Sequence, residues 1–194
     1  RLRDPLVAGD VLIGVACGLG AAVAQAAQYA AANHLEGGRL MPLAFQLDTL
    51  LGLRRALGQA LYSVRDTGVG AMTMLFLLVV LKAVLRSQVA TMVAFVVIVY
   101  VVFPMVGQSS TTALNLAGGL LTVGICTALV LRRGFLALAV TMVVYTLAFA
   151  LPLQVGLEAW ARPVAVFSVL LLAVPAVLAF RAAVGPRRAA GVAA

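Results

Sequence analysis

The triplet Asp66-Thr67-Gly68 matches the catalytic triplet of aspartic proteases. That chemistry needs two such carboxylates, which share one proton in a β-rich cleft. This chain contains one such triplet, at the end of a segment with helical rather than strand periodicity. A bare triplet in that context carries little information, and a protease site is not predicted.

Other residues with catalytic or metal-binding potential are too scattered to form a site. His34 is the only histidine, and its place at the end of an apolar segment is typical of a solvated end residue. Glu36 and Glu158 fall in loops, whereas intramembrane metalloproteases need clustered His and Glu within their spans. Cys17 and Cys126 lie in apolar segments without a CxxC neighbour, which favours buried small side chains over metal or redox work. We therefore predict no catalytic residue, no cofactor-binding residue and no metal ligand in this chain.

Polar groups close to apolar segments have structural explanations as well. Asp10 and Lys82 lie near segment ends, where the carboxylate can cap a helix and the lysine can reach the membrane surface. Turn and N-cap chemistry accounts for the polar run from Gly107 to Asn115. The glycines of "GVACGLG" lie inside an apolar segment, whereas a phosphate-binding loop needs a strand before it and a helix that opens at the glycines.

The composition is that of a membrane protein. Of the 194 residues 64% are hydrophobic and 10% charged, whereas soluble domains contain about 25% charged residues. The net charge of +8 is expected for a membrane protein, because Lys and Arg collect in cytoplasmic loops. The chain has no basic run with interleaved aromatic residues, so nucleic acid is not an expected partner.

Apolar runs separated by short breaks predict an all-α integral membrane fold, a six-transmembrane-helix bundle forming a single domain over 1–194. Each run approaches the ~20 residues that a helix needs to cross the hydrocarbon core. Pro175 is expected to kink the last span. The predicted spans are about 9–32, 68–85, 88–106, 113–131, 135–155 and 163–181.

The distribution of Lys and Arg predicts that both termini are cytoplasmic, in an inner (plasma) membrane. Nine basic residues fall on the side of the termini, in the two tails and in the breaks at 82–86 and 132–133. On the opposite side, 107–112 has none and 156–162 has only Arg162. The exception is the external 33–67 segment, which carries four arginines.

Residues 49–65 within that segment predict an amphipathic helix between the first two spans. At 100° per residue, Arg55 and Tyr62 fall opposite one narrow apolar face, which is made of Leu50, Leu53, Leu57, Leu61 and Val64. Asp48 is the expected N-cap, and Gly68 the expected stop. Two interpretations stay open: a helix lying in the outer membrane interface with its leucines buried, or a lid packed over the bundle.

The first span carries small residues at four-residue intervals: Gly14, Gly18, Ala22, Ala26 and Ala30. Small residues on one face allow two helix backbones to approach closely in a membrane. We expect this face to be a helix contact.

Four segments together resemble the membrane region of membrane-anchored bacterial serine/threonine protein kinases. "LRDPLVAGDVLIG" (Leu2 to Gly14) is similar to the junction after the kinase domain, and "LGLRRALGQ" (Leu51 to Gln59) to a Gly-x-Arg-x-x-Leu-Gly helix of that region. "LRSQVATMVAFVVI" and "LRRGFLALAV" resemble its Arg-led span starts. The chain departs from the family at "LPLQVGLEAW" (Leu151 to Trp160), where a more aromatic loop rich in Thr, Asp and Ser is expected.

The resemblance implies a C-terminal membrane domain that anchors, and senses signals for, a cytoplasmic kinase domain. ATP and Mg would bind that domain, since the kinase motifs are missing from this chain. The first residue, Arg1 rather than Met, fits a piece of a longer protein. Expected partners are the lipid bilayer and the kinase domain of the same chain, and a homodimer is left open. The alternative function is a transport module, half of a small permease, which should show broken spans and midplane polar groups.

Overall fold

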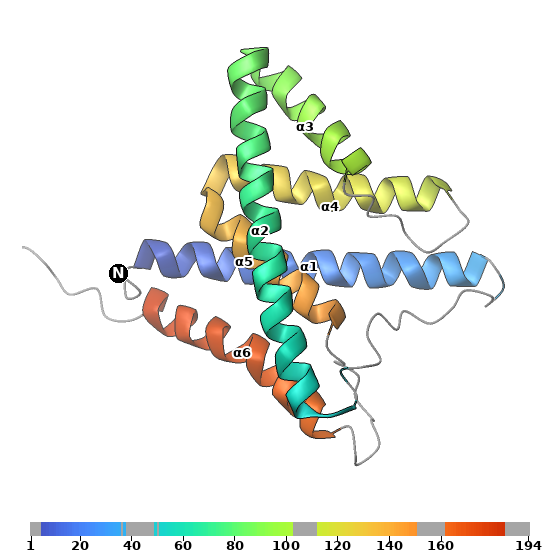
Figure 1. The fold of residues 1–194 in the computed structure, drawn as a ribbon, viewed down its shortest axis with the longest axis vertical. Helices are drawn as coiled ribbons and strands as arrows, with labels where there is room; N and C mark the ends of the chain where they lie inside the picture. Colours follow the sequence, from blue (N-terminus) through green and yellow to red (C-terminus); the bar gives the residue numbers. More distant parts are fainter. Residues whose placement is uncertain are drawn as a thin grey trace, which may run out of the picture.

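Six helices make up the fold in Figure 1, a computed structural model that describes residues 5–35, 37, 49, 51–102, 112–150 and 162–184. The described ranges contain no strand, so the all-α prediction is confirmed for them. The helices are α1 (Pro5–Leu35), α2 (Leu53–Leu85), α3 (Gln88–Val102), α4 (Thr112–Arg133), α5 (Phe135–Ala150) and α6 (Arg162–Val184).

Three helices are long and apolar enough to cross a membrane: Leu6–Leu35, Leu53–Leu85 and Arg162–Ala183. The described part of the chain thus supports three spans rather than the six expected. α3 has 15 residues and α5 has 16, both below the ~20 that a full crossing needs. The spans predicted over 88–106 and 135–155 end among residues outside the described ranges.

The predicted separation of an amphipathic helix (49–65) from a second span (68–85) is wrong. Both belong to α2, which runs unbroken for 33 residues, and Gly68 lies inside it. One glycine in a helix costs only about 1 kcal/mol. Buried side chains on both sides of Gly68, among them Thr67 and Ala71, hold the helix together. At 1.5 Å per residue α2 is about 50 Å long, which exceeds a hydrocarbon core of about 30 Å.

Local chemistry explains where the helices begin and end. Pro5 opens α1, where the missing N–H costs nothing. α2 begins after Gly52, whose φ of 138° favours glycine, and the expected N-cap Asp48 lies outside the described residues. Gly134 ends α4 with a φ of 89°, and its N–H donates to the carbonyls of Leu129 and Val130 at 3.2 Å each.

The remaining helix features are the α2–α3 joint and Pro175. α2 ends at Arg86, which adopts the left-handed conformation. The Ser87 hydroxyl then accepts a long hydrogen bond, 3.5 Å, from the N–H of Ala90 at the start of α3. Pro175 lies inside α6, which continues on both sides of it, and the kink remains a prediction.

α1 packs most closely against α5, through bare backbone at two glycines. A Cβ added at Gly14 would lie 2.8 Å from Val140 Cβ, and one at Gly18 would lie 2.7 Å from the carbonyl oxygen of Thr141. The Thr141 hydroxyl lies 3.0 Å from the carbonyl oxygen of Gly14 across the interface and 2.7 Å from that of Ala137 on its own helix, so its one proton is shared between the two acceptors. The predicted close helix contact is confirmed at these two positions.

The same face was predicted to continue to Ala26 and Ala30, and there the prediction is wrong. Ala22 is still buried, but Ala26 and Ala30 are exposed. Four residues turn an α-helix through about 400°, so a four-residue repeat drifts about 40° at each step. After three steps the small residues have rotated away from α5.

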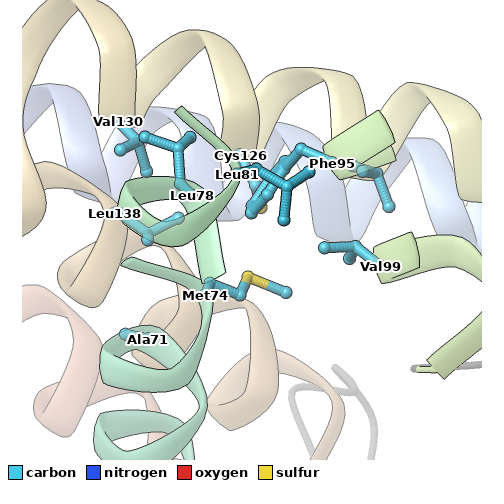
Figure 2. Close-up of a cluster of buried hydrophobic side chains, with 10 residues drawn as sticks. Ala71, Met74, Leu78, Leu81, Phe95, Val99, Cys126, Val130 and Leu138 are labelled. Carbon is cyan, nitrogen blue, oxygen red and sulfur yellow. The ribbon is translucent and has the colours of Figure 1, made fainter. Parts of the chain in front are cut away.

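Figure 1 shows α2 running across α1 and α4 rather than alongside them. Four helices meet at the crossing, where α2 packs on α3, α4 and α5. The cluster there includes Met74 and Leu78 of α2, Phe95 of α3, Cys126 of α4 and Leu138 of α5 (Figure 2). α5 lies at the centre of the fold, in contact with α1, α2, α4 and α6.

We expect Gly18→Leu to lower the thermal stability of the protein in detergent by roughly 1–3 kcal/mol, the usual cost of overpacking a tight contact. The side chain would force α1 away from the Thr141 backbone and weaken the Thr141–Gly14 hydrogen bond. Gly20→Leu is the matched control, because Gly20 is exposed and a Cβ there meets no atom within 4 Å. Equal melting temperatures for the two variants would contradict the α1–α5 contact.

Candidate functional site

The protease-like triplet lies in the middle of α2 and forms no cleft. Asp66 is exposed, and the buried Thr67 hydroxyl donates to the carbonyl oxygen of Ser63 on its own helix. Gly68 continues the helix. The hydroxyl serves the helix backbone and the carboxylate points away from the fold, so this arrangement lacks the paired carboxylates of aspartic-protease chemistry.

The other residues considered from the sequence lie far apart along the fold. His34 and Lys82 are exposed in the last turns of α1 and α2, and Asp10 is half-buried near the start of α1. Cys126 is buried and Cys17 half-buried, and both are free thiols. Within the described ranges no three His, Cys, Asp or Glu side chains come together as metal ligands. Glu36, Glu158 and most of the polar run from Gly107 to Asn115 lie outside those ranges.

The N-terminal half of α2 (residues 53–67) contacts the protein through small side chains. Ala56 is 0% exposed and Ala60 is 4% exposed, and both pack in one cluster with Leu147 of α5 and Val164 of α6. Ser63 and Thr67 continue the same buried face, one helical turn apart. This face binds the half-helix to the rest of the fold.

The leucines of this half-helix lie on a second face, which points away from the protein. Leu57 is 47% exposed and Leu61 is 64% exposed. The lid interpretation is therefore wrong for the leucine face, because a lid would bury these side chains against the bundle. Arg54, Arg55 and Arg65 are exposed as well. The half-helix thus has an apolar exposed side and a charged exposed side, and it continues without a break into the apolar C-terminal half of α2.

One cavity opens between α1, α2, α5 and α6 and is apolar throughout. Its volume is about 320 Å³, and its walls include Val15 of α1, Val64 of α2, Val143 of α5 and Pro175 of α6. Without a polar group, the lining offers no hydrogen bond that could orient a ligand.

Another cavity, between α1 and α4, combines apolar walls with side-chain amides. It has a volume of about 350 Å³ and is lined by Gln25 and Gln28 of α1 and by Gly118 and Thr122 of α4, with alanines and Leu121 around them. This site is not among those predicted from the sequence. The available signal was the three-residue spacing of the two glutamines in an otherwise alanine-rich apolar segment, because residues at i and i+3 share a helix face.

Compared with protein-family models, with curated proteins and with solved structures, the chain matches none of them.

We expect the leucine face of α2 to contact lipid, and brominated lipids can test this, because bromine quenches a nearby tryptophan. With the single Trp160 replaced by Phe, Leu57→Trp places the probe on the leucine face. Tyr62→Trp is the control, because five residues separate the two positions by about 140° around the helix. Quenching should be several-fold stronger for Leu57→Trp. Equal quenching would contradict the lipid contact of the leucine face.

Proposed function

We propose that this chain is a helical membrane domain that anchors a cytoplasmic catalytic domain in the lipid bilayer. The proposal that this is a membrane domain is supported by the large exposed apolar surface along the long helices. Phe76 and Val84 of α2 are 70% and 73% exposed, and Leu178 of α6 is 60% exposed. Soluble monomers rarely expose contiguous apolar patches of more than a few hundred Å², and such surfaces mark membrane or protein contacts.

In this proposal the chain crosses an inner membrane six times, with both termini in the cytoplasm. Two observations support the orientation. The Pro5 end of α1, the α4–α5 joint and the Val184 end of α6 all lie toward the left of Figure 1. Arg132 and Arg133 end α4, and Arg181 lies in the last turn of α6. The C-terminal ends of α4 and α6 thus carry basic residues on the side of the N-terminus, as the positive-inside rule requires of a cytoplasmic face, whereas the C-terminal end of α2, with Lys82 in its last turn, lies at the top of Figure 1.

The attached catalytic domain would be a serine/threonine protein kinase, as the resemblance of "LRDPLVAGDVLIG" and "LGLRRALGQ" implies. ATP and Mg would bind in that domain. The second of these segments lies in the N-terminal half of α2, which joins the span of the same helix without a break. A signal acting on this half-helix would therefore reach the membrane core through one rigid element.

The alternative of a transport module has less support. Transporters bind substrate at broken helices near the bilayer midplane. In the described part of the chain, α2 and α6 are each continuous, and the charged pair Arg65–Asp66 is exposed rather than turned into the fold.

The proposed orientation predicts the activity of reporters that work only in the cytoplasm. A reporter fused after Ala194 should be active, and one inserted after Gly38 should be inactive, because an odd number of crossings separates the two positions in a six-span topology. Whole-cell reporter activity, normalised to expression, is the measurement. The reverse pattern would overturn the orientation and the kinase proposal together.

The kinase proposal requires the motifs His-Arg-Asp and Asp-Phe-Gly upstream of Arg1 in the parent protein, and a reading frame without them would overturn it.

In that parent we expect Ala60→Leu to change autophosphorylation in membranes severalfold, because it overpacks the contact of α2 with Leu147 and Val164. The matched control Gly58→Leu should have no effect, since Gly58 is exposed and meets no atom within 4 Å. Equal activity of Ala60→Leu, Gly58→Leu and wild type would reduce the domain to an anchor without a sensing role.

A further inference from the structure

The cavity between α1 and α4 has polar groups at its wall, although α1 is largely apolar. Gln25 and Gln28 reach it from α1, and Thr122 reaches it from α4. Its volume of about 350 Å³ lies within the range of small-molecule pockets, about 300–1,000 Å³. α1 is one of the three helices apolar and long enough to span a membrane, so these amides belong to a candidate span.

Gly118 creates the room for one of the two amides. A Cβ at this position would overlap the side-chain amide of Gln28, so any other residue would displace that side chain from the wall of α4. The Gln28 side chain is held against α4 backbone in this way, and its amide oxygen is buried. The amide of Gln28 is thereby positioned at the wall of the cavity.

The polar side chains at the cavity wall determine which hydrogen bonds a ligand can form there. The Thr122 hydroxyl already donates to the carbonyl oxygen of Gly118 at 3.0 Å, so toward the cavity it offers acceptor lone pairs. The Gln25 amide has two N–H donors and an acceptor oxygen, whereas the oxygen of the Gln28 amide is buried against α4, so Gln28 can contribute only N–H donors. The wall can therefore donate to a carbonyl group and accept from a hydroxyl group of one ligand.

None of the residues that line the cavity carries a charge. A phosphate or a carboxylate placed there would lose its hydration without meeting a cation, which is costly in a low-dielectric setting. The alanines and Leu121 that complete the wall suit hydrocarbon. The fitting ligand is an uncharged molecule with hydroxyl and carbonyl groups attached to an apolar chain.

We propose that the α1–α4 cavity binds the uncharged head of a neutral glycerolipid of the diacylglycerol type. The ester carbonyls accept from the amides of Gln25 and Gln28, and the free hydroxyl donates to the amide oxygen of Gln25 or to Thr122. The acyl chains extend along the apolar surface of the helices. This site is additional to the proposed anchoring function and holds whether or not the attached domain is a kinase.

Photo-crosslinking in phosphatidylcholine nanodiscs tests the proposal. The probe is a diacylglycerol with a diazirine on the acyl chain next to the ester, and the charged counterpart is a phosphatidic acid with the same chains. In wild type the diacylglycerol probe should label residues 24–31 and 118–122, and unlabelled diacylglycerol should compete. The phosphatidic acid probe should label these segments several-fold less. Labelling by both probes alike, or no competition, would overturn the proposal without any variant.

Substitutions then assign the effect to the amides. Gln25→Leu and Gln28→Leu should each reduce labelling several-fold, because they keep the bulk and remove the hydrogen bonds. The matched control is Gln88→Leu, at the exposed first residue of α3, which should label like wild type. Thermal unfolding in the same nanodiscs checks that each variant is folded. If Gln28→Leu unfolds through its contact with Gly118, Gln25→Leu decides, and wild-type labelling of a folded Gln25→Leu would contradict the site.

Discussion

The contact between α1 and α5 is the constraint on which the rest of this structure depends. Lipid tails are as apolar as leucine, so apolar helices gain little from mutual burial in a membrane and associate through close packing and hydrogen bonds instead. Gly14 and Gly18 have no side chain where α5 approaches α1, and the Thr141 hydroxyl shares its proton between the carbonyl oxygen of Gly14 at 3.0 Å and that of Ala137 at 2.7 Å. Held in this way, α5 offers its other sides to α2, α4 and α6.

The sequence could predict this contact because glycine spacing reports directly on backbone approach. It could also predict the all-helical class, because long apolar runs have few other stable forms in a bilayer. It could not predict how far the contact extends, since the rotation of a straight helix removes Ala26 and Ala30 from a four-residue repeat. The described helices support three of the six predicted spans, because α3 and α5 are short within the described ranges and the apolar runs alone do not show where these helices end.

The sequence could not show which of the two apolar faces of the N-terminal half of α2 contacts the rest of the protein. In water the leucine face would be the buried one, and Ala56 and Ala60 would count as neutral positions. In this fold the small face packs on α5 and α6 while Leu57 and Leu61 are exposed. Close packing selects small residues for the protein side of a membrane helix, and the lipid accepts the large ones. The break expected at Gly68 failed for a related reason, because this small face continues past the glycine through Thr67 and Ala71.

Buried hydroxyl groups in this fold mostly serve the backbone of their own helix. Thr127 donates to the carbonyl oxygen of Val123, and Ser168 donates to that of Val164, each at 2.7 Å. A hydroxyl has one proton, so each of these groups has no donor left for a ligand. A glutamine amide has two donors and an acceptor, and one internal hydrogen bond does not exhaust them. Of the two cavities, the one between α1 and α4 is therefore the one that can recognise a polar ligand, because Gln25 and Gln28 bring side-chain amides to its wall and the other has an entirely apolar lining.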